Sequence, residues 1–183
     1  MMTVEELLDK KQEPLEEVQA QIESNSDSPL LNTEIADHDA DHMKRVTVLA
    51  AYIAEHEKVR QFRQELMDAA LFHDCGRTHE FEDATHGADS YKRYRAEYGD
   101  NEIVEFLMAY HCQENEDAER ALETFAEKDR PAVWKAYCVL RDADALDRLR
   151  LPMGDSLDPA YLHFAYSRKL IGVDRELISK YKI

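Results

Sequence analysis

A histidine and an aspartate stand side by side at the end of an apolar stretch, in the segment Leu71-Phe72-His73-Asp74-Cys75-Gly76-Arg77. Adjacent helical residues point about 100° apart, so both side chains reach the interior only near a helix end or with a metal ion between them. Similar residues occupy other inward positions: His42, His111 and Asp144 on apolar stripes, and His86 where a helix is predicted to begin. Histidines and carboxylates that face one interior from separate elements are the composition of a metal site.

Asp144 strengthens this interpretation, because an ionised carboxylate is costly in a core. It lies four, seven and eleven residues after Leu140, Tyr137 and Val133, so a helix places all four on one stripe. Burying it without a partner or a metal would cost several kcal/mol. A single histidine on such a stripe is more often a hydrogen-bonded core residue than a ligand. The prediction therefore rests on the coincidence of five elements that each offer a histidine or an aspartate.

The elements that position these residues are all predicted to be helices, because apolar residues recur at three- and four-residue spacings and no stretch alternates long enough for a strand. The predicted helices cover residues 3–24 as one or two helices, a segment from about residue 33 or 37 to 57, and residues 58–74, 86–98, 101–111, 117–128, 131–150, 161–170 and 174–181. Gly76 is expected to end the third helix as its C-cap, and Thr85 to cap the fourth. The polar run 24–29 separates an N-terminal helical arm, residues 1–28, from an all-α main domain, residues 29–183.

Composition narrows the classes of partner. The chain has 183 residues and a net charge of −16, which opposes binding to nucleic-acid polymers and to anionic membranes. No stretch approaches the roughly 18 apolar residues of a membrane span. The odd number of cysteines, Cys75, Cys112 and Cys138, indicates reduced thiols. With no basic segment and apolar run at the N-terminus, these features predict a cytoplasmic location.

The ordered set of His42, His73-Asp74 and Asp144 resembles the HD superfamily of metal-dependent phosphohydrolases. His42-Met43-Lys44-Arg45-Val46 fits the region of the family's first histidine, and Leu71 to Arg77 fits its Leu-x-His-Asp-x-Gly-Lys/Arg pattern. Ala143-Asp144-Ala145-Leu146 matches the family's Ala-Asp-x-Leu segment. The resemblance covers about residues 35–150 and implies an HD-domain helical bundle.

Two further histidines resemble the dinuclear branch of that superfamily. His86-Gly87-Ala88 is similar to a His-x-x-Gly-Ala segment with contracted spacing, and His111 to a histidine on the next helix. Many members carry two adjacent histidines where this chain has His111-Cys112. The resemblance implies one or two divalent ions bridged by Asp74. Nitrogen and oxygen ligands without thiolate favour Fe, Mn, Co or Mg over Zn. The implied ligands are His42, His73, Asp74, His86, His111 and Asp144.

The resemblance implies hydrolysis of a phosphomonoester or phosphodiester in a small molecule, with a nucleotide as the expected class. His73 and Asp74 would be catalytic, and Arg77 would hold the substrate phosphate. Further expected substrate contacts are Arg45, His38 and Arg148. Two alternatives stay open: a di-iron oxygenase that uses the same ligands, and a non-catalytic nucleotide-sensing HD domain. The oligomeric state is left open.

Overall fold

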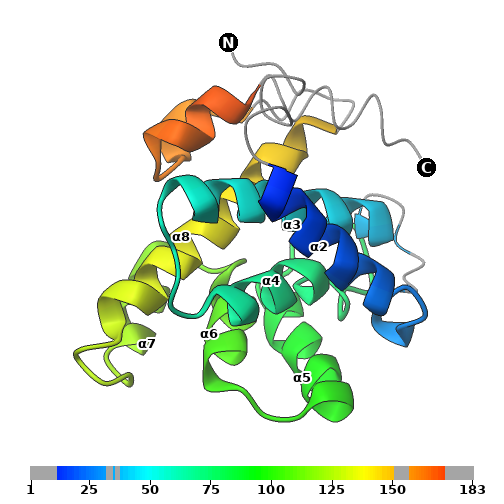
Figure 1. Cartoon of the computed structure of the whole chain (residues 1–183). Coiled ribbons are helices and arrows are strands. Elements are labelled where there is room, and N and C mark those ends of the chain that lie inside the picture. The colour runs from blue at the N-terminus through cyan, green and yellow to red at the C-terminus, as the bar shows by residue number, and fades with distance from the viewer. Residues whose placement is uncertain (1–11, 32–34, 36–37, 151–156, 172–183) are drawn as a thin grey trace.

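A computed structural model of the chain describes residues 12–31, 35, 38–150 and 157–171, and every regular element within these ranges is a helix (Figure 1). The prediction of an all-α fold is confirmed. Among these residues, no helix combines the length and apolar character needed to cross a bilayer. The elements are α2 (Gln12–Ser24), η1 (Pro29–Leu31), α3 (Ala40–His56), α4 (Arg63–Phe72), α5 (His86–Tyr98), α6 (Glu102–Tyr110), α7 (Asn115–Leu122), α8 (Arg130–Asp147), η3 (Arg148–Arg150) and η4 (Pro159–Tyr161).

Local sequence explains where two of the site-bearing helices begin. Asp39 is the N-cap of α3, and its carboxylate accepts a hydrogen bond from the backbone N–H of His42 at 2.9 Å. Asn101 does the same for α6, where its side-chain oxygen accepts from two N–H groups of the first turn. Such caps satisfy donors that have no partner within the helix.

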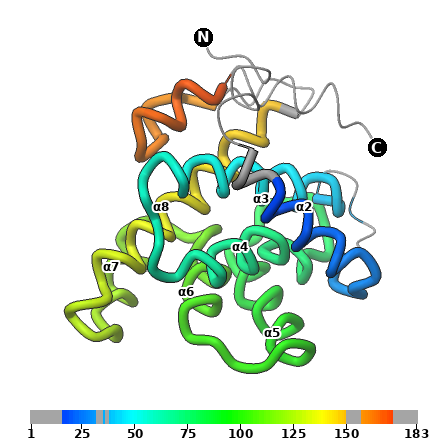
Figure 2. Tube along the Cα trace, viewed as in Figure 1, coloured from blue at the N-terminus to red at the C-terminus, as the bar shows by residue number. Residues whose placement is uncertain are grey.

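Helix α3 lies at the centre of the bundle, where it packs against α8, α4 and α2 (Figure 1). Its predicted stripe, His42, Val46, Leu49 and Ile53, is fully buried. Helices α5 and α6 pair with each other on the far side of α4, as the trace in Figure 2 shows, and α6 also packs on α4 and α8. This packing places three segments beside α3 and α8: the end of α4, the end of α6 and the start of α5.

Two glycines allow α5 to approach its neighbours closely. A Cβ on Gly76 would overlap the backbone of α5 at Ser90, and the N–H of Gly76 donates to the Ser90 hydroxyl at 2.8 Å. A Cβ on Gly87 would overlap the carbonyl oxygen of Met108 in α6. Because the overlapping atoms belong to the backbone, they cannot turn away as a flexible side chain would. The two glycines therefore set the spacing of α5 from the turn after α4 and from α6.

The third predicted helix is shorter than expected. It begins at Arg63 and not at Lys58, because Lys58 and Phe62 have φ angles of 58° and 60°. These left-handed conformations end the preceding segment and turn the chain before α4 starts. The polar helix predicted over residues 117–128 is also shorter than expected, since the corresponding helix α7 covers Asn115–Leu122.

Two predicted caps take other roles. Helix α4 ends at Phe72 with His73 as its C-cap, so Gly76 serves the close approach to α5 and is not the cap. Thr85 occupies the N-cap position of α5 without a side-chain cap, and its hydroxyl donates to Asp83 Oδ1 at 2.7 Å. In both cases a tertiary or loop contact takes the place of the expected local one.

The described part of the N-terminal arm packs on the bundle. Val18 in α2 is fully buried, Gln21 donates to Asp68 at 2.8 Å, and Arg63 pairs with Glu17 at 2.9 Å. These contacts link α2 to α4, in addition to its packing on α3. The division of the chain at residue 28 stays a prediction, and residues 1–11 lie outside the described part.

The C-terminal segment 157–171 is anchored by a buried carboxylate of α8. Asp142 accepts hydrogen bonds from the backbone N–H groups of His163 and Phe164, at 2.8 and 3.0 Å, and from the His163 ring. Residues 165–171 are helical, within the predicted range 161–170 apart from one residue. The helix predicted over 174–181 lies outside the described residues.

Candidate metal centre

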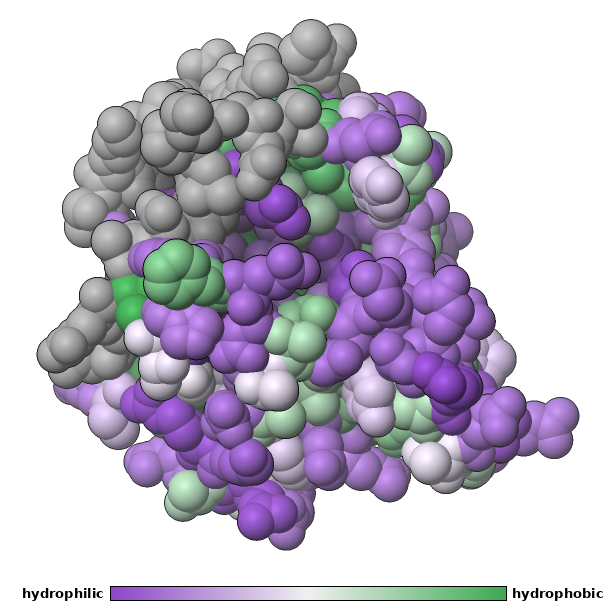
Figure 3. Space-filling view, turned by 180° about the vertical axis from the view of Figure 1, so that it is seen from behind, coloured by the Kyte–Doolittle hydropathy of each residue, from purple (hydrophilic) through white to green (hydrophobic). Residues whose placement is uncertain are grey.

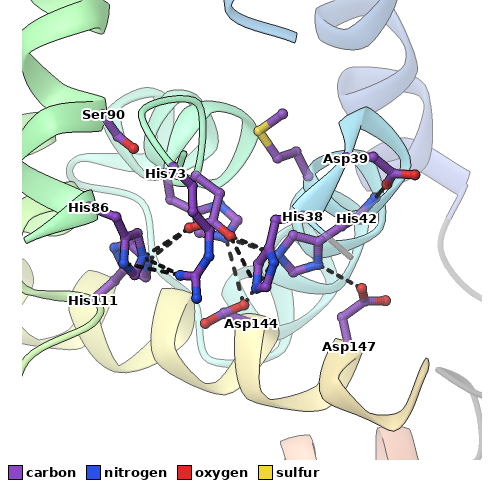
Figure 4. Close-up of polar contacts among 12 residues, drawn as sticks. His38, Asp39, His42, His73, His86, Ser90, His111, Asp144 and Asp147 are labelled. Atoms are coloured by element: carbon purple, nitrogen blue, oxygen red, sulfur yellow. Dashed lines mark hydrogen bonds and ion pairs between the residues drawn. The ribbon is translucent and has the colours of Figure 1, made fainter. Parts of the chain in front are cut away.

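Six side chains from five elements converge on one interior point (Figure 4). Five of them are at most 5% exposed, and the Asp144 side chain is 30% exposed. The structure thus brings together every residue that the sequence predicts as a metal ligand. They are His42 in α3, His73 and Asp74 directly after α4, His86 at the start of α5, His111 directly after α6, and Asp144 in α8.

Each of the four histidines presents the same nitrogen to this point. In each ring Nδ1 faces an oxygen: His42 faces Asp147 Oδ2 at 2.7 Å, and His73 and His111 face the carbonyls of Ala70 and Met108 at 2.9 and 2.6 Å. His86 Nδ1 faces the carbonyl of residue 83. A carbonyl oxygen accepts only, so Nδ1 holds the proton and the Nε2 lone pair points inward. This is the tautomer a metal-binding imidazole needs.

Asp74 lies between two groups of histidines and faces each with a different oxygen. Its Oδ2 is 3.5 Å from His42 Nε2 and 3.8 Å from His73 Nε2. Its Oδ1 is 3.0 Å from His86 Nε2 and 3.5 Å from His111 Nε2. A carboxylate with one oxygen in each of two donor groups has the arrangement required of a ligand shared by two ions.

The first group of donors, called here the α3–α8 half, consists of His42, His73, Asp74 Oδ2 and Asp144. Asp144 Oδ1 lies 3.5 Å from His42 Nε2 and 3.6 Å from His73 Nε2. The second group, called the α5–α6 half, contains His86 and His111, whose Nε2 atoms are 3.0 Å apart. Asp74 belongs to both halves.

The donors fit a bound cation better than they fit one another. The Nε2 atoms of His42 and His73 lie 3.2 Å apart, and with Nδ1 protonated both carry lone pairs that repel. Asp74 Oδ1 is fully buried and has no hydrogen-bond partner among the described residues. A buried acceptor without a partner costs about 1–3 kcal/mol. A cation in each half would satisfy these lone pairs together.

The electrostatics of the site keep its carboxylates ionised. Burial alone would raise the pKa of Asp74, but the charge of His73 and the neighbouring rings of His111, His42 and His86 hold that pKa well below its usual value. Burial would likewise raise the pKa of Asp144, and hydrogen bonding and charge from His73, with the charge of His42, depress it strongly. Anionic carboxylates beside imidazoles are the state that binds metal.

The two histidines of the α5–α6 half differ in their pKa. Burial lowers the pKa of His111, which favours the neutral, ligating ring. Burial also acts to lower the pKa of His86, but its interactions with Asp74 and Cys112 raise it to about 10. The Asp74 carboxylate, 3.0 Å away, therefore favours a positive charge at His86 Nε2, where a metal ion would take the place of a proton.

A cleft of about 600 Å³ opens onto Asp74 and Asp144. Three of the four predicted substrate contacts line it: His38, Arg77 and Arg148. The Arg77 guanidinium donates to the carbonyls of His79 and Phe81 at 3.2 and 3.1 Å, which fixes it against the His86 ring. Burial, outweighing the opposing charge of Asp74, lowers the pKa of His38 to about 4, so the ring is neutral near pH 7.

The fourth predicted substrate contact, Arg45, has a different place. Its Nε and Nη2 donate to the two oxygens of Asp147 at 2.7 and 3.1 Å, and it does not line the cleft. Asp147 is fully buried and also accepts from His42 Nδ1. The structure therefore places Arg45 behind the His42 ring, where it orients Asp147 and through it His42.

Sequence reasoning missed three residues of the centre. Asp147 follows Asp144 by one helical turn, and that spacing was the available signal. Arg141 lines the cleft and donates to the carbonyls of His111 and Gln113, both at 2.6 Å. Cys112 groups with His86 and His111 as a possible metal donor.

Comparison with known proteins agrees with this geometry. No curated protein sequence and no solved structure matches the chain. The family model described as HD domain matches residues 39–149, more than half of the sequence and every one of the six convergent residues. Most members of this family are metal-dependent hydrolases. The chain belongs to the HD domain family.

Proposed function

We propose that this protein is a metal-dependent phosphohydrolase that acts on a small phosphorylated molecule, with a nucleotide as the expected class. The observation that supports the proposal is the position of Asp74, whose two oxygens face two separate histidine groups. A pair of bound ions, when present, would lower the pKa of a shared water and hold phosphate oxygens during displacement.

The residues of the chain divide the remaining tasks. The α3–α8 half would hold one ion through His42, His73, Asp74 and Asp144, and the α5–α6 half would share Asp74 with a second. Arg77 is fixed at the cleft wall by two carbonyls and points its guanidinium at the site, where it would orient a phosphate.

The neutral ring of His38 would meet the substrate beside Asp74. Its Nδ1 lies 2.8 Å from Glu80 and its Nε2 lies 3.8 Å from Asp74 Oδ2. With the proton on Nδ1, Nε2 can accept a hydrogen bond from water or from a substrate hydroxyl. We assign His38 to substrate positioning.

The proposal is tested by loading the protein with Mn or Fe and assaying nucleoside monophosphates, dinucleotides and generic phosphate esters. Asp74→Ala should abolish phosphate release, while Arg77→Ala should raise KM or lower kcat with bound metal unchanged. Arg60→Ala is the control, because Arg60 is exposed, pairs with Glu55 and does not line the cleft. Oxygen-dependent turnover without phosphate release would instead identify the oxygenase alternative.

A further inference from the structure

Beside the three donors of the α5–α6 half, which are His86, His111 and Asp74 Oδ1, lies the thiol of Cys112. One ligand atom from each of His86, His111 and Cys112 lies within 4.8 Å of the others. Cys112 directly follows His111, and its Sγ is 3.4 Å from the carbonyl oxygen of Ala84, two residues before His86. The sulfur therefore lies between the end of α6 and the start of α5, beside both histidines.

The surroundings of Cys112 differ from those of the other two cysteines. Cys75 and Cys138 are buried, and burial raises the pKa of each thiol to about 12, which suits inert core residues. Cys112 is half-buried and lines the cleft together with Asp74 and both histidines of this half. Of the three, Cys112 is the thiol that a metal ion entering the cleft would meet.

A second, independent feature indicates an ion in this half. Asp74 Oδ1 faces His86 and His111, its side chain is 3% exposed, and it lacks a hydrogen-bond partner among the described residues. Together with two inward Nε2 lone pairs and a sulfur, it leaves four donors of three chemical types around one point. One cation at this point would bind all four.

We propose that Cys112 is a thiolate ligand of the ion held by His86, His111 and Asp74 Oδ1. On binding, the Cys112 thiol loses its proton to solvent and its sulfur forms a bond to the metal. The α5–α6 half then has two nitrogens, one oxygen and one sulfur, while the α3–α8 half has two nitrogens and two carboxylates. Thiolate favours Zn or Co(II) over Mn and Mg, so the two halves prefer different metals.

Cobalt spectroscopy tests the sulfur directly and needs no substrate. Metal-free protein is titrated with Co(II) to saturation, and a thiolate-to-cobalt charge-transfer band should appear in the near-ultraviolet. Cys112→Ser should lose that band and still bind cobalt in the α3–α8 half. Cys138→Ala is the matched control, because Cys138 is a buried cysteine of α8 that does not line the cleft, and it should keep the band.

Zinc binding gives the second readout. Cys112→Ser should weaken one of two zinc equivalents by about tenfold or more, and Cys112→His should restore a second ion without the charge-transfer band. A band that persists in Cys112→Ser, or its absence from wild-type protein that has bound cobalt, overturns the proposal and leaves the proposed function intact. Failure of the wild type to bind any cobalt or zinc would overturn the metal centre itself, on which both rest.

Discussion

At the residue scale, each imidazole ring of the centre is oriented by a hydrogen bond at Nδ1, the nitrogen that faces away from the site. Three of the four ligand histidines face the carbonyl three residues earlier with Nδ1, an i−3 contact at or beside a helix end. His42 lies inside α3, where carbonyls are occupied by the helix, and it uses the carboxylate of Asp147 instead. The rings are therefore oriented before any ion binds, which reduces the ordering required on binding.

Asp147 should affect metal binding without touching the metal. Asp147→Asn keeps an oxygen for His42 Nδ1 but loses the charge that binds Arg45, so affinity of the α3–α8 half should fall by about 10- to 100-fold. Asp142→Asn is the control, because Asp142 is equally buried in α8 but bonds the C-terminal segment. Metal titration monitored by calorimetry measures both. Equal affinities in the two variants would contradict the assignment.

Stoichiometry should separate the shared ligand from the others. Asp74→Ala should remove both ions, because each half loses an oxygen donor and both sets of imidazoles lose their counter-charge. His111→Ala should remove only the ion of the α5–α6 half, and His42→Ala only that of the α3–α8 half. Elemental analysis after gel filtration counts the ions, with the exposed His79→Ala as control. Loss of both ions in His111→Ala would mean that the halves do not bind independently.

The sequence predicted which side chains converge better than it predicted the residues that hold them in place. His42 and Asp144 stand out because a polar residue on an apolar stripe requires an explanation. The available signal for Asp147 is its spacing, one helical turn after Asp144. Its role depends on how α3 packs on α8, because His42 and Asp147 are 105 residues apart in the sequence. Cys112 was assigned as a reduced thiol because a cysteine without a spaced partner has no pattern of its own.

At the element scale, the helices could be predicted because apolar residues on their buried faces recur every three or four positions. The predicted helix boundaries were wrong where a tertiary contact took the place of a local capping contact. Lys58 and Phe62 adopt positive φ without being glycine or asparagine, so no residue type marks the turn before α4. Gly76 has the residue type of a C-cap, but its freedom is used for contact with α5. Both the start of α4 and the role of Gly76 therefore depend on contacts with residues distant in the sequence, which the local residue types do not show.

The glycine contacts should couple packing to metal binding. Gly87→Ala places a methyl group against the Met108 carbonyl, so α5 and α6 must separate, at about 1–3 kcal/mol of unfolding free energy. The same separation moves His86 from His111 and should weaken the ion of that half. Gly99→Ala is the control: its φ of 92° makes alanine strained, by about 1–2 kcal/mol, but nothing lies within 4 Å of the added group.

Denaturant unfolding and metal titration separate the two effects. Both variants should lose stability, and only Gly87→Ala should lose affinity in the α5–α6 half. A Gly87→Ala protein with wild-type affinity would show that the close approach of α5 and α6 does not position the site.

At the scale of the whole molecule, charge opposes the proposed substrate at long range. The net charge is −16, and the face in Figure 3 is largely hydrophilic with small apolar patches. Carboxylates also lie at the cleft, at Glu80, Glu82, Asp83 and Glu114, beside three arginines. A long polyanion would meet this field along its length, whereas a small phosphate reaches the arginines and the metal centre at short range.

The sign of the salt dependence follows from this arrangement. Added monovalent salt screens the long-range repulsion and leaves contacts inside the cleft less affected, since screening acts beyond about 8 Å at physiological ionic strength. We therefore expect kcat/KM on a nucleotide to rise by about twofold or more between low and physiological salt, and to rise more for a triphosphate than for a monophosphate. Activity on long oligonucleotides should stay low throughout. Steady-state kinetics at fixed metal concentration measure the trend. A phosphate monoester of low charge that releases an uncharged alcohol is the reference, because its kcat/KM should depend least on salt. A kcat/KM that falls with salt would show that the arginines attract substrate from a distance and that the net charge does not govern its approach.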